Sequence, residues 1–477
     1  MQKSKQNVYS KLFSNTIIFA IGSFSSKILV FLMIGLYTRT LSKAEYGSVD
    51  LITQLENLIL PIVTLSISEA VIRFGLDKAY RKKNVFSTAA IVAIGGIAVF
   101  TVFMPLVLKI KYVQGFEDLF YIYLITASIK LVFSEFVRSR ELVKLYAFNG
   151  LLTTATMIAL NIIFLINLKL GISGYLSAII LSDLISSVFL FFVAKIYNYF
   201  SFKSFDKDIA KRMLKYAIPL IPTTIMWWIT SVSDRFLVEH YLGADANGLY
   251  TVAYKIPTII TTIYTMFNQA WNMSAITEHE NKGRSRFYKN VFDINTSVLY
   301  VLAAGILLFL IPLIQILIGP SFYNSYLYSP ILVVTTVFTC MCQFLGGIYI
   351  AAKKTVHSFV TSAFAGGINI ILNIILIPRI GINGASLATL ISYMAVFIFR
   401  LIDIQKISKF EFLPGKIIIN TVFLGAMMLS IIYIKNLVFI PLIILFTIVF
   451  LLNFIPLKKA AKKVLPQKII SHIPFLK

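Results

Sequence analysis

The sequence predicts an all-α polytopic membrane protein with about 14 transmembrane helices, arranged as two pseudo-symmetric six-helix lobes followed by two C-terminal helices. Three observations predict this class. First, 58% of the residues are hydrophobic and only 13% are charged, whereas soluble proteins carry roughly 25% charged residues. Second, apolar runs long enough to cross a hydrocarbon core of about 30 Å recur along the chain. Third, two long stretches of the sequence resemble each other.

The internal repeat is visible in two pairs of segments. LNIIFLINLKLGISG starts at Leu160, and LNIILIPRIGING starts at Leu372. LSKAEYG starts at Leu41, and LGADANG starts at Leu242. The repeat unit is therefore roughly two hundred residues long, far beyond the period of about 20–50 residues of a solenoid. This indicates duplication of a whole lobe, an organisation typical of membrane transporters.

The spans follow in order along the chain. The first lobe takes spans near 13–36, 49–72, 85–108, 118–137, 147–168 and 174–195. The second lobe takes spans near 214–238, 249–273, 290–318, 326–351, 358–378 and 384–403. Two more spans lie near 416–434 and 437–456. The basic N-terminus leads into a full-length span, so we expect it to be retained and not cleaved as a signal peptide.

These spans predict four parts of the chain. They are an N-lobe at 1–197, a cytoplasmic interlobe linker at 198–213, a C-lobe at 214–405, and a last part at 406–477 with spans 13 and 14 and a basic cytoplasmic tail. The linker is basic and amphipathic, so we expect it to contact anionic lipids at the cytoplasmic surface.

The distribution of positive charge tests this topology. With a cytoplasmic N-terminus, 33 of the 44 Lys and Arg residues fall in inside segments and eight fall outside. Lys and Arg are enriched in cytoplasmic loops, so both termini are predicted to be cytoplasmic. Six spans per lobe is an even number, and we therefore expect both lobes to insert in the same orientation, with a pathway between them.

Several function classes are excluded by what the sequence lacks. It contains no nucleotide-binding P-loop, no His/Cys cluster with metal-ligand spacing and no loop long enough for a catalytic domain. We therefore expect no enzyme, no catalytic residues, no cofactor and no metal. The net charge of +24 lies between apolar runs and not on a soluble basic domain, which argues against nucleic acid. Cys340 and Cys342 are expected to be buried thiols.

Basic residues inside or at the ends of spans are the strongest local signal. A Lys or Arg at a span centre costs about 2.5–3.5 kcal/mol to insert, so it faces protein or water. The sequence predicts a cationic cavity for an anionic substrate, with these candidates: Lys27, Arg235, Lys255, Lys130, Arg39 and Arg73. At about 1.5 Å per residue, Arg235 and Lys255 lie at a similar depth below the outer surface and could converge.

The alternative is that these charges only pair within the protein. Asp234 could pair with Arg235 or Lys255, and Glu69 with Arg73. Glu135 could pair with Lys130 or Arg138. The remaining acids, Glu56 and Asp183, are candidates for binding a coupling cation or for polar contacts between helices. Pro61 and Pro257 interrupt spans 2 and 8 at broadly comparable places.

Several segments carry a family resemblance: LYTRTLSKAEYGSVDLI, SEAVIRFGLDK and SDRFLVEHYLGADANGLYTVAYKIP. The chain resembles the polysaccharide transporter, or O-antigen flippase-like, family of the multidrug/oligosaccharidyl-lipid/polysaccharide exporter superfamily. The resemblance implies movement of undecaprenyl-diphosphate-linked oligosaccharide from the inner to the outer leaflet of the bacterial cytoplasmic membrane. It implies two lobes that rock between inward-open and outward-open states, with a polysaccharide polymerase and glycosyltransferases as partners and H⁺ or Na⁺ as a coupling ion.

Two related functions remain as alternatives. A lipid II flippase shares this architecture, but span 2 lacks that family's asparagine- and arginine-rich segment. A multidrug/cation antiporter normally has twelve spans and an acidic cavity, whereas this sequence has more predicted spans and basic charges inside them.

Overall fold

The computed structural model describes residues 28–107, 109–434 and 438–464, and over these ranges the protein is helical with no strand. The N-terminal half contains α2 (Ile34–Thr40), α3 (Lys43–Val63), α4 (Ile67–Gly75), α5 (Lys82–Val107), α6 (Glu117–Ser139), α7 (Val143–Asn161), the π-helix η2 (Ile162–Asn167), α8 (Gly171–Val193) and α9 (Lys207–Ala217). The C-terminal half contains α10 (Leu220–Leu242), α11 (Ala244–Lys255), α12 (Thr258–Glu278), α13 (Arg284–Leu317), η5 (Pro320–Leu327), α14 (Ser329–Ala351), α15 (Thr355–Ile380), α16 (Ile382–Ile407), α17 (Pro414–Tyr433) and α18 (Phe439–Val464).

These helices confirm a polytopic membrane protein, although not a count of 14 spans. In the described ranges, ten helices are long and apolar enough to cross a membrane, or eleven if the bent pair α3 and α4 is one span. Predicted span 1 lies mostly outside the described residues. Helices α10 and α12 occupy predicted spans 7 and 8 but are not among the ten, because each carries several polar side chains along its length.

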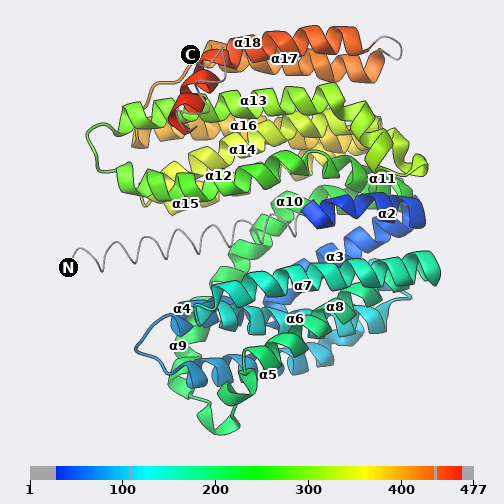
Figure 1. Ribbon diagram of the computed structural model, residues 1–477, viewed down its shortest axis with the longest axis vertical. Helices are drawn as coiled ribbons and strands as arrows, with labels where there is room; N and C mark the ends of the chain where they lie inside the picture. The colour runs from blue at the N-terminus through cyan, green and yellow to red at the C-terminus, as the bar shows by residue number, and fades with distance from the viewer. Residues whose placement is uncertain (1–27, 108, 435–437, 465–477) are drawn as a thin grey trace. The chain divides into compact units, whose positions relative to one another are not determined.

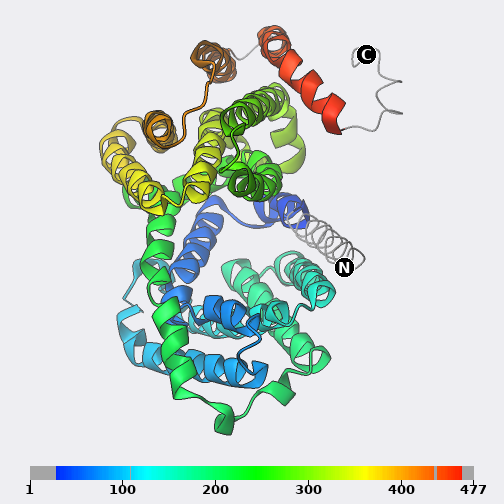
Figure 2. The same cartoon turned by 90° about the vertical axis from the view of Figure 1, so that its left-hand side faces the viewer.

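The chain divides into two compact units, the first ending at Val232 and the second beginning at Ser233. Helix α10 therefore begins in the N-terminal unit and ends in the C-terminal unit (Figure 1). The core of the N-terminal unit joins α4, α5, α6 and α9 through Val71, Phe86, Phe136 and Met213, all nearly inaccessible to solvent. Helix α9 contributes only one face to this core and exposes its basic face. Figure 2 shows α9 beside α4 and α5, the helices with which it packs.

The C-terminal unit is built around α14, which packs against α12, α13 and α16. Helices α17 and α18 pack on α13 and are linked to each other and to it by polar contacts. The Asn453 amide donates to Asn420 Oδ1 at 2.6 Å, and Lys416 Nζ lies 2.6 Å from Asp293 Oδ1 on α13. The two C-terminal helices predicted outside the duplication therefore belong to the fold of this unit.

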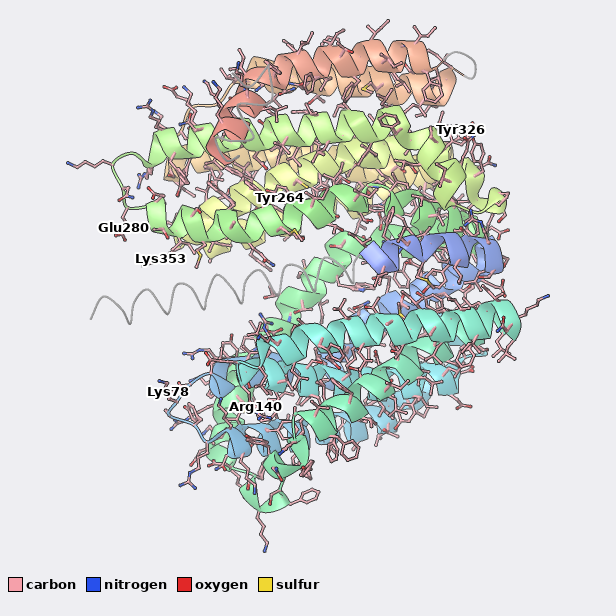
Figure 3. The ribbon with its side chains drawn as sticks, viewed as in Figure 1. Lys78, Arg140, Tyr264, Glu280, Tyr326 and Lys353 are labelled. Atoms are coloured by element: carbon pink, nitrogen blue, oxygen red, sulfur yellow. The ribbon has the colours of Figure 1, made fainter. Side chains whose placement is uncertain are left out.

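The ends of the helices within each unit agree with the predicted alternation of loops. In the N-terminal unit, Lys78 and Arg140 lie at the same end of the helices (Figure 3). In the C-terminal unit, Glu280 and Lys353 lie at one end and Tyr326 at the other (Figure 3). Lys78, Arg140, Glu280 and Lys353 all belong to loops predicted on the cytoplasmic side.

The repeated GISG and GING segments share two structural features in the two units. The first glycine of each, Gly171 and Gly381, has a positive φ of 55° and 62° and turns the chain into the next helix, α8 or α16. This region of φ is readily accessible only to glycine. The second glycine of each, Gly174 and Gly384, faces a close neighbour: a Cβ on Gly384 would lie 2.4 Å from the Leu376 carbonyl oxygen. Both repeated segments therefore place a glycine with a positive φ, followed by a closely packed glycine, where one helix gives way to the next.

Replacing Gly384 by alanine is expected to destabilise the protein by about 1–3 kcal/mol, because the new methyl group meets backbone that must shift. Gly174→Ala should cost less, since its closest neighbour is the Leu170 side chain at 2.9 Å. Gly367→Ala on α15 is the matched control, with nothing within 4 Å of its added Cβ. The thermal unfolding midpoint of the purified protein in detergent measures all three. An unchanged midpoint for Gly384→Ala would contradict the packing described here.

The second predicted span is broken, as the interruption by proline suggests. Helices α3 and α4 meet at an angle of 59°. Pro61 lies in the last turn of α3, where a proline removes a backbone donor and crowds the preceding turn. Leu65 and Ser66 then adopt left-handed backbone conformations, and the Ser66 N–H donates to the Pro61 carbonyl at 2.8 Å. In the second unit, Pro257 lies between α11 and α12, so both lobes contain an interrupted helix at roughly similar places.

Candidate functional site

A buried polar cluster in the N-terminal unit joins Glu56 on α3, Tyr123 and Lys130 on α6, and Asp183 on α8; we call it the Glu56–Asp183 cluster. Lys130 Nζ lies 2.6 Å from Asp183 Oδ1. The Tyr123 hydroxyl donates to Glu56 Oε2 at 3.3 Å. Tyr123 and Lys130 share one face of α6 because they are seven residues, or two helical turns, apart. Three helices of one unit thus direct polar groups to a common place.

The two carboxylates of this cluster are deeply buried. Glu56 is 5% exposed and Asp183 is 4% exposed, whereas the Lys130 side chain is 32% exposed. Glu56 is close enough to interact electrostatically with both Asp183 and Lys130. One ammonium group balances only one carboxylate, so the ionised cluster would keep a negative charge in an apolar bundle. Such a charge is costly unless a proton or a cation neutralises it.

The structure gives Lys130 a partner that the sequence did not suggest. Glu135, the nearest acid along the chain, is instead 3.4 Å from Arg138. The true partner, Asp183, lies 53 residues away on another helix. Glu56 and Asp183 were both singled out from the sequence as candidates for a coupling cation, but nothing in the sequence indicated that they meet.

A second cluster lies in the C-terminal unit, on the second half of α10 and on α11. We call it the Arg235 cluster, and its members are Asp234, Arg235, Tyr250, Tyr254 and Lys255. The Arg235 guanidinium carbon lies 5.8 Å from the centre of the Tyr254 ring. Tyr250 and Tyr254, one helical turn apart, form an edge-to-face pair with centroids 5.6 Å apart. Lys255 follows Tyr254 at the end of α11 and is half-buried.

The Asp234 carboxylate in this cluster is buried and hydrogen-bonded. It accepts hydrogen bonds from the Tyr250 hydroxyl and, at 2.9 Å, from the backbone N–H of Arg235. Arg235 stacks on Tyr254, the residue that precedes Lys255, and the convergence of Arg235 with Lys255 itself stays a prediction. The cluster offers one guanidinium, one ammonium and two aromatic rings within one unit.

The remaining predicted site residues lie apart from these two clusters. Lys27 lies outside the described residues. Arg39 is exposed at the end of α2 and lines a pocket of about 320 Å³ with Glu45 and Lys169. Arg73 and Glu69 are exposed on α4 and, within the part of the chain that the structure describes, form no ion pair with each other.

One buried arginine was missed as a site candidate because it falls at the predicted inner end of span 12. Arg400 on α16 is only 4% exposed. Its guanidinium donates to the Cys342 carbonyl at 2.7 Å, to Thr361 Oγ1 at 2.9 Å and to Ser362 Oγ at 2.8 Å. These acceptors lie on α14 and α15, so Arg400 links three helices. These acceptors are neutral and join the three helices, which indicates a structural role.

The tryptophans with described side chains are engaged in packing. Trp271 stacks on Phe344 with centroids 3.9 Å apart, and its indole N–H donates to the Phe344 carbonyl at 2.8 Å. The indole N–H of Trp228 donates to the Gln54 carbonyl at 2.8 Å. Cys340 and Cys342 are buried free thiols, as expected.

Comparison with known proteins supplies the family. A model of the polysaccharide biosynthesis protein family matches residues 12–272, more than half of the chain. The uncharacterized membrane protein MJ1375 of Methanocaldococcus jannaschii is 26% identical over 265 residues, which make up 52% of this chain and 62% of that protein. The chain therefore spans less than two thirds of the length of that relative.

Solved structures supply the fold. The lipid II flippase MurJ in an inward closed conformation matches with a TM-score of 0.68 at 15% identity, covering 94% of this chain and 99% of its own. A multidrug resistance MATE family transporter of the MOP superfamily, in an inward-facing conformation, matches with a TM-score of 0.66 at 16% identity, covering 80% of this chain and 96% of its own. Such low identities show the fold alone.

The predicted class is thereby confirmed. The solved neighbours are a flippase and a transporter, not enzymes, and their fold is that of the superfamily that the sequence resembles. The fold, the membrane helices and the match over residues 12–272 agree, and the chain belongs to the polysaccharide biosynthesis protein family.

Proposed function

We propose that this protein is a flippase for undecaprenyl-diphosphate-linked oligosaccharides, which it moves from the cytoplasmic to the outer leaflet of a bacterial cytoplasmic membrane by alternating access. The observation that carries the proposal is the Arg235 cluster, in a protein of the polysaccharide biosynthesis family. Arg235 stacks on Tyr254, and Lys255 follows Tyr254 in sequence. The cluster thus supplies two cations and the partly exposed ring of Tyr254 from one unit of the fold, while Tyr250 is buried beneath it.

The chemistry of this cluster suits a diphosphate-linked sugar. A guanidinium group can hold two phosphate oxygens at once, and an ammonium group acts as a compact point charge beside it. A tyrosine ring offers an apolar face and a hydroxyl group, both of which a sugar can contact. Lys27, Arg39, Arg73 and Lys130 remain further candidates for binding the substrate.

We propose that the Glu56–Asp183 cluster couples transport to H⁺ or Na⁺. Its two buried carboxylates share one lysine, so a proton or cation would neutralise the remaining charge. A ligand shifts a conformational equilibrium only if it binds the two states differently. Binding or release of the ion at α3, α6 and α8 would supply that difference if these helices move against one another. Asp234 and Glu69 are retained as candidates for charge pairing or for coupling.

The partners follow from this function. Glycosyltransferases would supply the lipid-linked oligosaccharide, and a polysaccharide polymerase would use it after transport. Anionic lipids would contact the basic cytoplasmic surface through general electrostatic attraction. Both termini are proposed to be cytoplasmic.

Deletion of the gene in its native host tests the proposal. We expect surface polysaccharide to be lost and its lipid-linked oligosaccharide precursor to accumulate in the inner leaflet, with both restored by the wild-type gene. The main alternative is a lipid II flippase, since the solved lipid II flippase has the same fold. In that case lipid II would accumulate and surface polysaccharide would persist. Unchanged levels of both lipid-linked precursors would contradict a flippase of either kind.

A further inference from the structure

A polar pocket lies at the end of α4, outside both clusters described above. It has a volume of about 280 Å³ and is lined by Arg73, Phe74, Asp77, Tyr80, Arg212 and Tyr216. The first four belong to α4 and the loop that follows it, and the last two belong to α9, the helix of the predicted linker. All six lie within the N-terminal unit.

The pocket is held in shape by the packing of α4, α5 and α9. Val71 of α4 and Met213 of α9 are buried in one hydrophobic cluster. The segment before α9 is fastened to α5, since the backbone N–H of Asp206 donates to Thr88 Oγ1 at 3.2 Å. The Phe74 ring forms edge-to-face contacts with Tyr80 and Tyr216, with centroids 5.2 Å and 6.3 Å apart. The aromatic wall of the pocket is therefore contributed by both sides.

The two arginines of the pocket differ in how they are held. Arg212 Nη1 donates to the Tyr80 hydroxyl at 3.1 Å, which fixes its side chain across the pocket. Arg73 is exposed and, among the residues that the structure describes, takes part in no side-chain hydrogen bond or ion pair. Each guanidinium keeps N–H donors that nothing in the pocket satisfies.

Two of the three nearby carboxylates accept backbone hydrogen bonds, and the third, Asp208, lies close enough to Arg212 to attract it. Asp77 Oδ1 accepts the backbone N–H of Ala79 at 2.9 Å, within its own turn. Asp206 caps α9 and accepts the N–H groups of Asp208 and Ile209. Segments 73–83 and 206–216 together contain nine basic and three acidic residues. The electrostatic potential at the pocket is therefore positive even with all three acids ionised.

We propose that this pocket binds the phosphate group of a lipid headgroup or of a soluble phosphate compound, with Arg73 and Arg212 as the phosphate ligands. Paired guanidinium groups bind phosphate through charge-assisted hydrogen bonds. The Tyr80 and Tyr216 hydroxyls add donors at the rim. Lys78 lies at the same end of the unit and extends the positive surface (Figure 3). The site is distinct from the Arg235 cluster and does not depend on the proposed transport function.

Native mass spectrometry of the full-length protein in neutral detergent tests the site. The probes are phosphatidic acid, diacylglycerol as its counterpart without phosphate, and inorganic diphosphate as a soluble competitor. We expect phosphatidic acid to bind and diacylglycerol not to bind. The R73A/R212A double variant should weaken phosphatidic acid binding at least about tenfold, since charge-assisted hydrogen bonds contribute strongly. If inorganic diphosphate displaces phosphatidic acid, the site recognises phosphate alone. If it does not, the site also needs the lipid. Either result supports the site as long as binding requires the two arginines.

Two further variants separate a built pocket from general surface charge. K82A/K83A removes two exposed basic residues from the start of α5 while leaving the pocket residues intact, and it should weaken binding less than about threefold. Tyr80→Phe leaves the net charge unchanged and removes the hydroxyl that positions Arg212 and offers a donor to the phosphate, so it should weaken binding severalfold even if R73A/R212A does not fold. Three results would each overturn the proposal. The first is an equal loss of binding in K82A/K83A and in R73A/R212A. The others are wild-type affinity in Tyr80→Phe and binding of diacylglycerol equal to that of phosphatidic acid.

Discussion

Replacing Arg235 by alanine is expected to lower export of surface polysaccharide roughly tenfold to 150-fold, the equivalent of losing about 1.5–3 kcal/mol of charge-assisted hydrogen bonding to the diphosphate. Arg235 is the forked donor of its cluster and stacks on Tyr254. Arg235→Lys keeps the charge but loses the planar fork, so its export should lie between those of the wild type and the alanine variant. Surface polysaccharide at equal membrane levels of each variant measures the effect.

Arg379→Ala is the matched control for this experiment. Arg379 is an exposed arginine of the same unit, on α15, so its removal changes net charge equally without touching the Arg235 cluster. We expect it to export polysaccharide like the wild type. Wild-type export by Arg235→Ala, with the protein present at normal levels, would remove the Arg235 cluster from the transport mechanism.

Replacing Asp183 by alanine is expected to impair both stability and transport. The change leaves Lys130 without its carboxylate partner at 2.6 Å. Because the Lys130 side chain is 32% exposed, the loss should be about 1–3 kcal/mol and not the larger cost of a fully buried pair. The thermal unfolding midpoint in detergent measures the stability, and polysaccharide export measures the transport.

The double variant Lys130→Met/Asp183→Leu separates structure from coupling. Removing both charges should restore most of the thermal stability, since apolar replacement of an ion pair is often neutral. Transport should stay impaired, because a coupling ion then has only Glu56 to bind. Lys289→Ala, in the exposed Lys289–Glu411 pair, is the control and should change the unfolding midpoint little. Full transport by the double variant would show that Asp183 is structural only.

The sequence predicted the architecture well because its signals are local and repeated. Long apolar runs, the asymmetry of Lys and Arg and the GISG and GING text each report on a short stretch of chain. The two glycines of each segment could be recognised as equivalent from sequence, whereas the positive φ of Gly171 and Gly381 is seen only in the structure. The predicted count of about 14 spans is not confirmed over the described residues, where α10 and α12 are too polar to register as ordinary spans.

The candidate sites were predicted less completely, because their members come from different helices. Lys130 was identified as an intramembrane cation, but its contact with Asp183 depends on how α6 packs against α8. Arg400 was counted as a cytoplasmic charge, since its hydrogen bonds to α14 and α15 are visible only once these helices are placed. The pocket between Arg73 and Arg212 depends on the folding of α9 back onto α4.

The central claim is that the protein moves a diphosphate-linked oligosaccharide between leaflets. Its most direct test is a leaflet assay with the purified protein in liposomes that contain undecaprenyl-diphosphate linked to a labelled sugar in the inner leaflet. We expect the label to become accessible to an external lectin or glycosidase when the liposomes contain the wild type. With Arg235→Ala, the label should become accessible far more slowly. The contradicting result is a label that becomes equally exposed in protein-free liposomes and in liposomes with the wild type under an imposed H⁺ or Na⁺ gradient.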